Sequence, residues 1–263
     1  MIDLKLWEPE PVRVVGWVEV DTVCNYCKKP MKTKVYDFFA DRCRERGIPV
    51  PATHPECQAK RDREREEEED RKWREDEQRI DSWAIASGLR PDYCLKSPVV
   101  PFVHRWLWDH RRSNILLSGE TGTGKSTSIG VCVRELIRDE RSVQVWYLTG
   151  LLDEWRNARC ESDIKTATNR LFRRLESTDY LIVDECADNN LNTDSTREFM
   201  FRLLEDVQNG SCRAKVWFSG NFYRGAVRDM FGNEPAALRR LQEKFACVRI
   251  DCIHKRLIPI FNY

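Results

Sequence analysis

A glycine-rich stretch in the middle of the chain constrains its fold more than any other feature. Residues 119–126 read Gly-Glu-Thr-Gly-Thr-Gly-Lys-Ser, which matches the pattern G-x-x-x-x-G-K-[ST] at every position. The run 114–117 before it predicts a buried strand, and apolar residues follow it at helical spacing, namely Ile129, Val133 and Ile137. A strand, a glycine-rich turn and a helix in this order place backbone N–H groups around a phosphate at the positive end of the helix. The stretch therefore predicts a nucleotide site in an α/β fold.

The residue types in this loop indicate the chemistry of each position. The glycines let the backbone curl around the β- and γ-phosphates of a nucleotide. Lys125 is expected to neutralise phosphate charge, and the hydroxyl of Ser126 is expected to bind Mg²⁺. The loop residues expected to contact ATP are Gly119, Thr121, Gly122, Thr123, Gly124, Lys125, Ser126 and Thr127.

A pair of acidic residues follows a second apolar strand. The apolar run 180–183 ends at Asp184 and Glu185, about 60 residues after the loop. At the carboxyl end of a central strand, such a pair faces the bound phosphates. We therefore expect Asp184 to bind Mg²⁺ together with Ser126, and Glu185 to orient the water that hydrolyses ATP. The alternative is that both are simply exposed acids after a core strand.

The N-terminal segment contains two pairs of metal-ligand residues. Two residues separate Cys24 from Cys27 and His54 from Cys57, and 26 residues lie between the pairs. Two pairs with this spacing fit a tetrahedral structural zinc site, and a segment with so little core would gain stability from a metal. We expect a small zinc-ribbon-like module with these four ligands. Cys43 is the alternative to His54 as the fourth ligand, and without metal the cysteines would be ordinary reduced thiols.

Composition divides the chain into three parts. Residues 1–57 contain short β-like runs and turns, and residues 58–80 are almost entirely charged. Residues 81–263 alternate apolar strand-like runs with amphipathic helical stretches, as in a parallel α/β domain. We expect these parts to be a zinc-binding module, a linker and an ATPase domain.

The charged segment is expected to be a solvated helical linker. Acidic residues precede basic residues by four positions, which favours a helix slightly. The pairs are Glu67 with Arg71, Glu68 with Lys72, Asp70 with Arg74, and Glu75 with Arg79. A coiled coil or partner-binding arm is the alternative, but the apolar positions of a heptad repeat are absent.

Overall composition limits the cellular setting. The net charge of +1 gives no global attraction to nucleic acid, so any DNA contact must come from a local patch. The N-terminus lacks the profile of a signal peptide, and no apolar run approaches the roughly 18 residues of a membrane span. A cytoplasmic protein without a membrane partner is expected. Its 11 cysteines are then expected to be reduced core residues or metal ligands.

Five further segments resemble one family when taken in order. They read GLRPDYCLKS, VQVWYLTGLLDEW, YLIVDE, FSGNF and LRRLQEKFACVRID. With the glycine-rich loop, they make residues 88–256 similar to the DnaC-type replicative helicase loaders and the related IstB transposition ATPases. The resemblance implies an AAA+ core with a five-stranded parallel sheet. Its strands are expected at 115–118, 143–148, 179–184, 215–219 and 246–251.

The resemblance also assigns further site residues. Asn221 matches the sensor 1 position, which contacts the γ-phosphate or the attacking water, although its S-G-N context alone would predict only a tight loop. Arg240 matches the arginine that reaches a neighbouring subunit's ATP site, and we prefer it to Arg239 because Leu241 follows it as in the family. The alternative is two solvated arginines on a helix. Arg256 falls near the basic sensor 2 position, where the correspondence is loose.

Two expectations about assembly and DNA follow from the resemblance. About a dozen residues follow the last expected strand, so no C-terminal helical lid is expected, and a neighbouring subunit or the helicase would complete the ATP site. The helix at 151–159 would contact single-stranded DNA. There Trp155 would stack on bases, and Arg156 and Arg159 would neutralise phosphates. Alternatively, Trp155 is buried in an amphipathic helix.

These observations favour one function over two others. The first is an ATP-hydrolysing loader of a hexameric replicative DNA helicase onto single-stranded DNA, which self-associates with ATP and DNA. The second is an IstB-like ATPase that coats duplex DNA and regulates a transposase. The third is an adaptor that binds ATP without hydrolysing it, which the joint presence of Lys125, Asp184, Glu185 and Asn221 disfavours.

Overall fold

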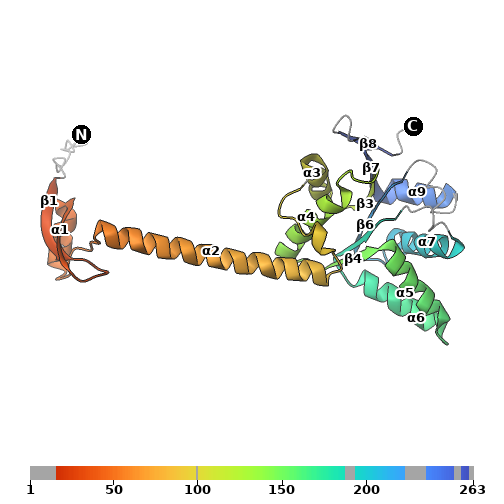
Figure 1. The fold of residues 1–263 in the computed structure, drawn as a ribbon, viewed down its shortest axis with the longest axis horizontal. Helices are drawn as coiled ribbons and strands as arrows, with labels where there is room; N and C mark the ends of the chain where they lie inside the picture. Colours follow the sequence, from red (N-terminus) through yellow and green to blue (C-terminus); the bar gives the residue numbers. More distant parts are fainter. Residues whose placement is uncertain (1–15, 99, 187–192, 223–234, 252–255, 261–263) are drawn as a thin grey trace, which may run out of the picture. The chain divides into compact units, whose positions relative to one another are not determined.

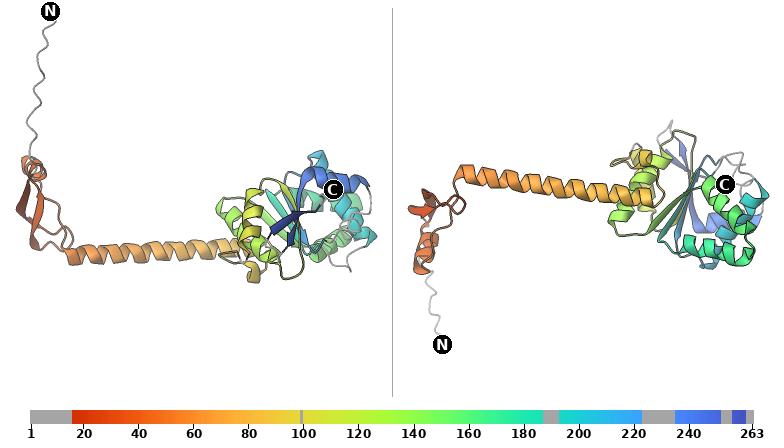
Figure 2. Two further views of the ribbon diagram at one scale, coloured as in Figure 1. Left: turned by 90° about the horizontal axis from the view of Figure 1, so that it is seen from above. Right: turned by 60° about the horizontal axis from the view of Figure 1, so that its bottom comes forward.

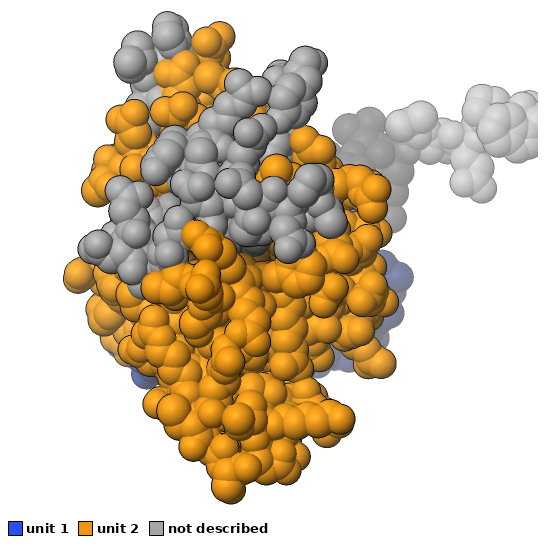
Figure 3. Space-filling view, turned by 90° about the vertical axis from the view of Figure 1, so that its right-hand side faces the viewer, with its two compact units in different colours: residues 1–75 blue, residues 76–263 orange. Residues whose placement is uncertain are grey.

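The computed structural model of the chain describes residues 16–98, 100–186, 193–222, 235–251 and 256–260. The chain divides into two compact units, residues 1–75 and 76–263, which Figure 3 distinguishes by colour. The boundary falls within one long helix. Among the described residues, no helix is both long enough and apolar enough to cross a membrane.

The first unit is built on a β-hairpin. Strands β1 (Trp17–Val23) and β2 (Pro30–Tyr36) pair antiparallel along their whole length, from Trp17 with Tyr36 to Val23 with Pro30. Helix α1 (Asp37–Glu45) follows directly. Among residues 16–75, the described part of this unit, the buried apolar residues before α2 are few and mostly small, namely Cys24, Ala40, Cys43 and Val50. Such a core is too small to stabilise the unit well by burial alone.

Helix α2 (Pro55–Ala86) covers the charged segment. Within the first unit its side chains form ion pairs along the helix, including the expected pairs Glu68 with Lys72 and Asp70 with Arg74. Within the second unit its last turns contribute the buried side chains of Glu77, Ile80 and Ala84. The end of the helix therefore belongs to the core of residues 76–263, whereas the sequence predicted a solvated linker up to residue 80.

The second unit contains a six-stranded sheet in the order β4-β5-β6-β3-β7-β8. The first five strands in this order are parallel, as the sequence predicted, and the sixth pairs antiparallel with β7. The edge strand β8 was not predicted, because four residues are too few to show a strand pattern. The strands are β3 (Asn114–Ser118), β4 (Val143–Tyr147), β5 (Tyr180–Asp184), β6 (Lys215–Gly220), β7 (Phe245–Asp251) and β8 (Arg256–Pro259).

Helices cover both faces of this sheet (Figures 1 and 2). The sheet therefore separates two apolar cores, one on each face. Along β3 the side chains alternate between them: Ile115 and Leu117 pack in the first core, and Leu116 packs in the second. The first core lies against the end of α2, η1, α3 and α4, and the second lies against α5, α6, α7 and α9. The helices are η1 (Pro91–Tyr93), α3 (Pro101–Asp109), α4 (Lys125–Arg138), α5 (Leu148–Cys160), α6 (Ile164–Glu176), α7 (Asp194–Asn209) and α9 (Pro235–Lys244).

Candidate functional site

The glycine-rich loop connects β3 to α4, as the sequence predicted. Gly122 and Gly124 have φ angles of +81° and +80°, a region that side chains with a Cβ rarely adopt. A Cβ on Gly124 would also lie 2.4 Å from Cγ2 of Val100. The first residue of α4 is Lys125, so the loop presents the N-terminal end of that helix. This geometry suits a phosphate, because unpaired N–H groups and the helix dipole both favour an anion there.

Hydroxyl and ammonium groups hold the loop in a closed turn. The Lys125 ammonium donates to the carbonyl oxygens of Gly119 and Glu120 at 2.7 and 2.9 Å. The Thr123 hydroxyl donates to the same Glu120 carbonyl at 2.8 Å, and the Thr127 hydroxyl donates to the carbonyl of Gly124 at 2.9 Å. Phosphate oxygens would compete with neutral carbonyls for the Lys125 ammonium, since charge-assisted hydrogen bonds are stronger.

Asp184 and Asn221 lie at the same edge of the sheet as the loop. Asp184 is the last residue of β5 and is buried, and Asn221 is exposed directly after β6. The ends of these strands are joined to the loop by the backbone, because the N–H of Gly119 donates to the carbonyl of Gly220 at 3.1 Å. On the other side of β6, the N–H of Cys186 donates to the carbonyl of Ser219 at 2.8 Å. The structure thus brings the predicted polar residues to one edge.

Glu185 has an unusual backbone and an unpredicted partner. Its φ angle is +57°, and its N–H donates to a carboxylate oxygen of Asp184 at 2.9 Å. Its carboxylate accepts two hydrogen bonds from the Arg90 guanidinium, at 3.0 and 3.3 Å. Sequence analysis missed Arg90 as a site residue. Its segment, GLRPDYCLKS, carried the family resemblance, but no motif indicated that it would reach an acid 95 positions away.

The two candidate arginines on α9 differ in exposure. The side chain of Arg240 is 19% exposed, pairs with Glu205 at 3.5 Å, and lies 4.8 Å from the ring centroid of Phe201. The side chain of Arg239 is 70% exposed and pairs only loosely with Glu243, at 3.6 Å. Arg240 is therefore held against α7 of its own chain, and of the two Arg239 is the more accessible to a neighbour.

Arg256 begins the edge strand β8. It pairs with Asp251 at 3.3 Å, next to the end of β7. Its side chain is more than half exposed. Strand β7 therefore lies between the strand of Arg256 and β3, the strand that leads into the glycine-rich loop. Contact of Arg256 with a nucleotide stays a prediction.

The expectation that Trp155 stacks on DNA is wrong. Its side chain is 2% exposed and packs with Phe172 and Phe199, at ring-centroid distances of 5.8 and 5.7 Å. An indole enclosed in this core cannot reach a base. The neighbouring arginines are more accessible, because Arg156 and Arg159 are both about half exposed and form ion pairs with nearby acids.

A candidate metal centre lies in the first unit. The ligand atoms of Cys24, Cys27, His54 and Cys57 all lie within 4.8 Å of one another. His54 Nδ1 lies 3.3 Å from the sulfur of Cys27, and the backbone N–H of His54 donates to the sulfur of Cys24 at 3.4 Å. Ligands of a tetrahedral zinc lie roughly this far apart, given bonds of about 2.0 to 2.3 Å. The alternative ligand Cys43 lies on α1, outside this cluster as the structure describes it.

The backbone around the cluster brings the two ligand pairs together. The turn after β1 is closed by a hydrogen bond from the N–H of Lys28 to the carbonyl of Cys24, at 2.9 Å. The Asn25 N–H donates to the carbonyl of Ala52 at 2.8 Å, which ties the second pair to the first. Sequence spacing predicted the pairs, and the long-range contact between Asn25 and Ala52 places them side by side.

The thiols in this cluster favour a bound cation. Burial acts to raise the pKa of Cys24, but N–H groups of Cys27, His54 and Tyr26 outweigh it and lower that pKa to about 5. Burial and the neighbouring cysteines raise the pKa of Cys57 to about 11. Burial is the largest cause of this rise in the pKa of Cys57, and repulsion between adjacent thiolates adds to it. A divalent metal removes that repulsion, so this set of donors fits zinc.

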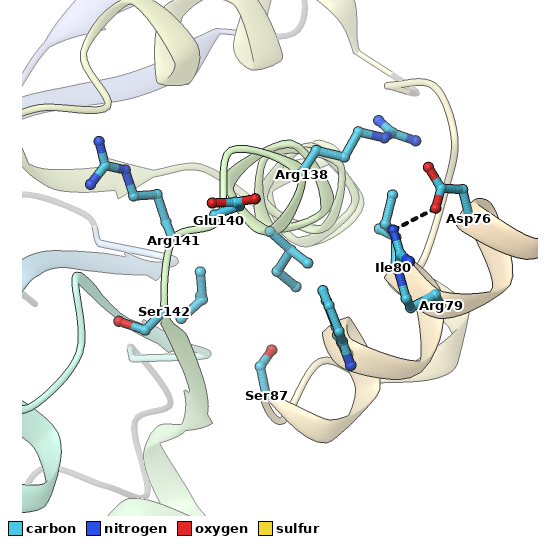
Figure 4. A pocket seen from close by; sticks show the side chains of 11 residues that line it. Asp76, Arg79, Ile80, Ser87, Arg138, Glu140, Arg141 and Ser142 are labelled. Carbon is cyan, nitrogen blue, oxygen red and sulfur yellow. Dashed lines mark hydrogen bonds and ion pairs between the residues drawn. The ribbon is translucent and has the colours of Figure 1, made fainter. Parts of the chain in front are cut away.

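A groove in the second unit lies away from the glycine-rich loop. It has a volume of about 680 Å³ and is lined by residues of the last turns of α2, the end of α4 and the start of β4 (Figure 4). Ser142 and Val143 line it at the amino end of β4, whereas the glycine-rich loop lies at the carboxyl edge of the same sheet. This groove is therefore separate from the candidate nucleotide site.

Strand order and site together define a class of protein. Five parallel strands run in the order β4-β5-β6-β3-β7. The glycine-rich loop follows β3, and the Asp184–Glu185 pair lies at the end of β5. This arrangement is that of a P-loop α/β domain, with the five-stranded parallel sheet that the resemblance to AAA+ proteins implied.

Comparisons with known proteins give only distant similarity. No family profile matches the sequence, and no curated protein matches it. A proposed primosome component from Streptococcus pyogenes serotype M3 is 11% identical, over 62% of this chain and 86% of that chain, with a TM-score of 0.45. AMPPCP-bound DnaA from Aquifex aeolicus is 15% identical over 62% and 52%, with a TM-score of 0.45. A DnaC helicase loader is 13% identical over 57% and 88%, with a TM-score of 0.44.

Proposed function

We propose that this chain hydrolyses ATP at the carboxyl edge of its parallel sheet. One observation supports this most strongly. The glycine-rich loop, the Asp184–Glu185 pair and Asn221 come from three separate segments, and backbone hydrogen bonds join the strand ends that carry them. Each group has the chemistry that phosphoryl transfer to water requires.

The residues would act in the following way. The Lys125 ammonium would move from the loop carbonyls to the β- and γ-phosphates. Ser126 and Asp184 would hold Mg²⁺, which supplies positive charge at these phosphates when it is bound. Glu185 would accept a proton from water as the water oxygen bonds to the γ-phosphorus and the bond to ADP breaks. Asn221 would donate a hydrogen bond to the γ-phosphate or to that water.

We further propose that the ATPase loads a hexameric replicative helicase onto single-stranded DNA. The sequence resemblance of residues 88–256 to DnaC-type loaders supports this, and so does the N-terminal Cys/His cluster, which is proposed below to bind zinc. In this proposal the module binds the helicase and residues 76–263 bind DNA. Exposed Arg156 and Arg159 on α5 would contact DNA phosphates. Because Trp155 is buried, this contact would be electrostatic and would weaken with salt.

The metal centre is proposed to hold zinc. Cys24, Cys27, His54 and Cys57 supply the sulfur and nitrogen donors that zinc prefers, in a unit whose described residues bury few apolar side chains. Zinc bound there would contribute to the folding of the unit.

The ATPase proposal is tested by replacing the water-orienting carboxylate. Glu185→Gln should bind ATP with normal affinity but hydrolyse it at least about 100-fold more slowly, because the amide cannot accept a proton. Turnover is measured with and without single-stranded DNA, and Glu140→Gln is the matched control, because Glu140 lies after α4 and has the same φ of +57° as Glu185. Normal turnover in Glu185→Gln would show that this residue is not the base.

The loader proposal needs a test of its own. The full chain should form a stable complex with the replicative helicase of its own source, and a chain lacking residues 1–57 should bind it more weakly. The alternative is an IstB-like protein, which would instead coat duplex DNA with ATP and ignore the helicase. Size-exclusion chromatography with helicase, single-stranded DNA and duplex DNA in parallel separates these two outcomes.

A further inference from the structure

Trp83 is the most exposed aromatic side chain among the described residues of the second unit. It lies in the last turns of α2 and is 53% exposed, whereas Trp155 is buried. The guanidinium of Arg79 lies 5.4 Å from the centroid of the Trp83 ring, which limits the rotamers of both side chains. A flat ring that is held in place and half exposed can stack on another planar group.

The indole of Trp83 lines the groove of about 680 Å³ at the amino edge of the sheet. Three buried apolar side chains line it as well, namely Ile80, Ile137 and Val143. Figure 4 shows Arg79 and Ser87 on the α2 side of the groove, and Arg141 and Ser142 on the β4 side. A groove of this volume, with an apolar lining and a few polar groups, can hold a planar ring and the charged group attached to it.

The charged side chains of the groove are mostly arginines. Arg79, Arg138 and Arg141 line it, together with the acids Asp76 and Glu140. Asp76 pairs with Arg79, and Arg138 is about half exposed. Arg141 is exposed and forms no ion pair among the described residues. The groove therefore carries more positive than negative charge, and Arg141 is available to an anion.

Basic residues continue from the groove along the same edge of the sheet. Burial raises the pKa of Tyr180, the first residue of β5, and the positive charges of Arg141, Arg111 and Arg112 oppose this rise. Three guanidinium groups therefore lie near the start of β5. The Asp179 carboxylate at this edge already accepts two hydrogen bonds from the residue before β4, at 2.9 and 2.8 Å. A local basic patch of this kind is what a chain of net charge +1 needs to bind nucleic acid.

We propose that this groove binds single-stranded DNA, with one base stacked on Trp83 and the adjoining phosphates bound by Arg138 and Arg141. The proposal rests on the proposed loading of a helicase onto single-stranded DNA, and it adds the aromatic contact that buried Trp155 cannot make. Stacking accepts any base and the arginines bind the backbone, so sequence preference should be small. A duplex should bind less well, because its bases stack on each other and cannot reach the indole. The candidate ATP site lies at the opposite edge of the sheet, so ATP and DNA can be bound together.

The first test measures the affinity of the full chain for a fluorescent oligodeoxythymidine of about 12 nucleotides, a length that one such site can cover. Trp83→Ala should weaken binding about 10-fold, the scale of one lost base–aromatic stack, and should leave its dependence on salt unchanged. Arg141→Ala should weaken binding and also reduce the slope of log K against log salt by about 0.7, because one phosphate contact is lost. Trp83→Phe keeps an aromatic ring and should retain most of the affinity.

Matched control variants make the same chemical changes away from the groove. Trp73→Ala removes a tryptophan of the same helix that is 55% exposed but lies in the first unit, and it should bind DNA normally. Arg65→Ala removes an exposed arginine from that part of the helix and should leave both affinity and salt slope unchanged. The thermal unfolding midpoint of each variant shows whether it is folded, and Trp83→Phe supplies the reading if Trp83→Ala is not.

Photo-cross-linking locates the bound base directly. A single-stranded oligonucleotide that contains bromodeoxyuridine, irradiated with the full chain, should cross-link to the peptide that contains Trp83. The inference is wrong if Trp83→Ala binds normally and the cross-link maps to α5, whose variants Arg156→Ala and Arg159→Ala would then lose affinity.

Two other outcomes separate this inference from the proposed function. If the wild-type chain binds no single-stranded DNA, the inference and the DNA part of the loader proposal both fail, while Glu185→Gln still tests the ATPase. If Trp83→Ala binds DNA normally but loses its complex with the helicase, the groove docks a protein, so the inference fails and the loader proposal stands.

Discussion

The carboxylate of Glu77, in the last turns of α2, is buried against the guanidinium of Arg134 on α4. Glu77 is 6% exposed and Arg134 is 1% exposed, and Arg138 and Lys96 also pair with this carboxylate. The last part of the charged segment is thus anchored to the helix that begins at the glycine-rich loop. An acid that reads as part of a solvated linker is a core residue of the second unit.

Glu77→Ala should destabilise the second unit strongly. Glu77→Ala removes one of two carboxylates that pair with buried Arg134, which keeps its pair with Asp81, and it also removes a partner of Arg138 and Lys96. Breaking a buried pair in this way costs about 3 kcal/mol. Urea unfolding of the full chain, followed by the fluorescence of its tryptophans, measures the loss. Glu69→Ala is the control, since Glu69 forms only an exposed pair with Arg65 and should cost less than about 1 kcal/mol. Equal effects of the two changes would contradict the role given to Glu77.

The same pair should make stability depend on pH. Burial acts to raise the pKa of Glu77, but the hydrogen bond and charge of Arg138 and the charges of Arg134 and Lys96 outweigh it and lower that pKa below its ordinary 4.5. A lowered folded pKa adds stability above pH 4.5, and this stability is lost as pH falls through the folded value. The free energy of unfolding should therefore differ between wild type and Glu77→Gln at pH 7, and the difference should shrink below pH 4. A constant difference would exclude this linkage.

Zinc removal should affect the two units differently. The full chain should contain about one zinc, and Cys24→Ser with Cys27→Ser should lose it and loosen the first unit. Metal analysis and hydrogen exchange measure both effects, and Cys43→Ser is the matched control that should keep the metal. The second unit should keep its ATP affinity in the double variant. Protein prepared without chelators that contains no zinc would contradict the metal assignment.

Lys125→Ala should abolish ATP binding. Its ammonium is the cation at the loop, and backbone N–H groups alone would hold a nucleotide more weakly. Equilibrium binding of a fluorescent ATP analogue should show a loss of at least about 100-fold, the scale of a lost charge-assisted contact to phosphate. Lys215→Ala, at the amino end of β6, should bind normally. Near-normal affinity in Lys125→Ala would place the nucleotide elsewhere.

Variants of the two α9 arginines test whether one acts in a neighbouring subunit. The sequence favoured Arg240, whereas its contacts with Glu205 and Phe201 must break before it can reach another chain. The acting arginine, when changed to Ala, should leave ATP affinity intact and lose DNA-stimulated turnover. Mixing that variant with Lys125→Ala should restore part of the rate, because each chain supplies the half of the site that the other lacks. If neither Arg239→Ala nor Arg240→Ala changes the rate, this part of the proposal is wrong.

Local chemistry explains what could be predicted from the sequence. The glycine-rich loop needs a strand before it and a helix after it, so its pattern specified both and the residues between them. The two Cys/His pairs have a spacing that few roles other than metal binding require, and the structure brings them into one cluster. The five parallel strands were predicted near their observed positions because each is a short apolar run.

Relations between distant segments came only from the tertiary structure. Burial of Trp155 depends on packing with Phe172 and Phe199, and a single amphipathic helix cannot show whether such a face is covered. The Arg90–Glu185 pair joins residues 95 positions apart, and it forms because segment 87–90 docks on β4 beside β5. The sequence alone determined which groups this protein carries for binding phosphate and metal, since backbone freedom and ligand spacing are local properties. The structure decided which charges are buried, which are paired and which are accessible, because these depend on contacts that form only when the sheet and its helices assemble.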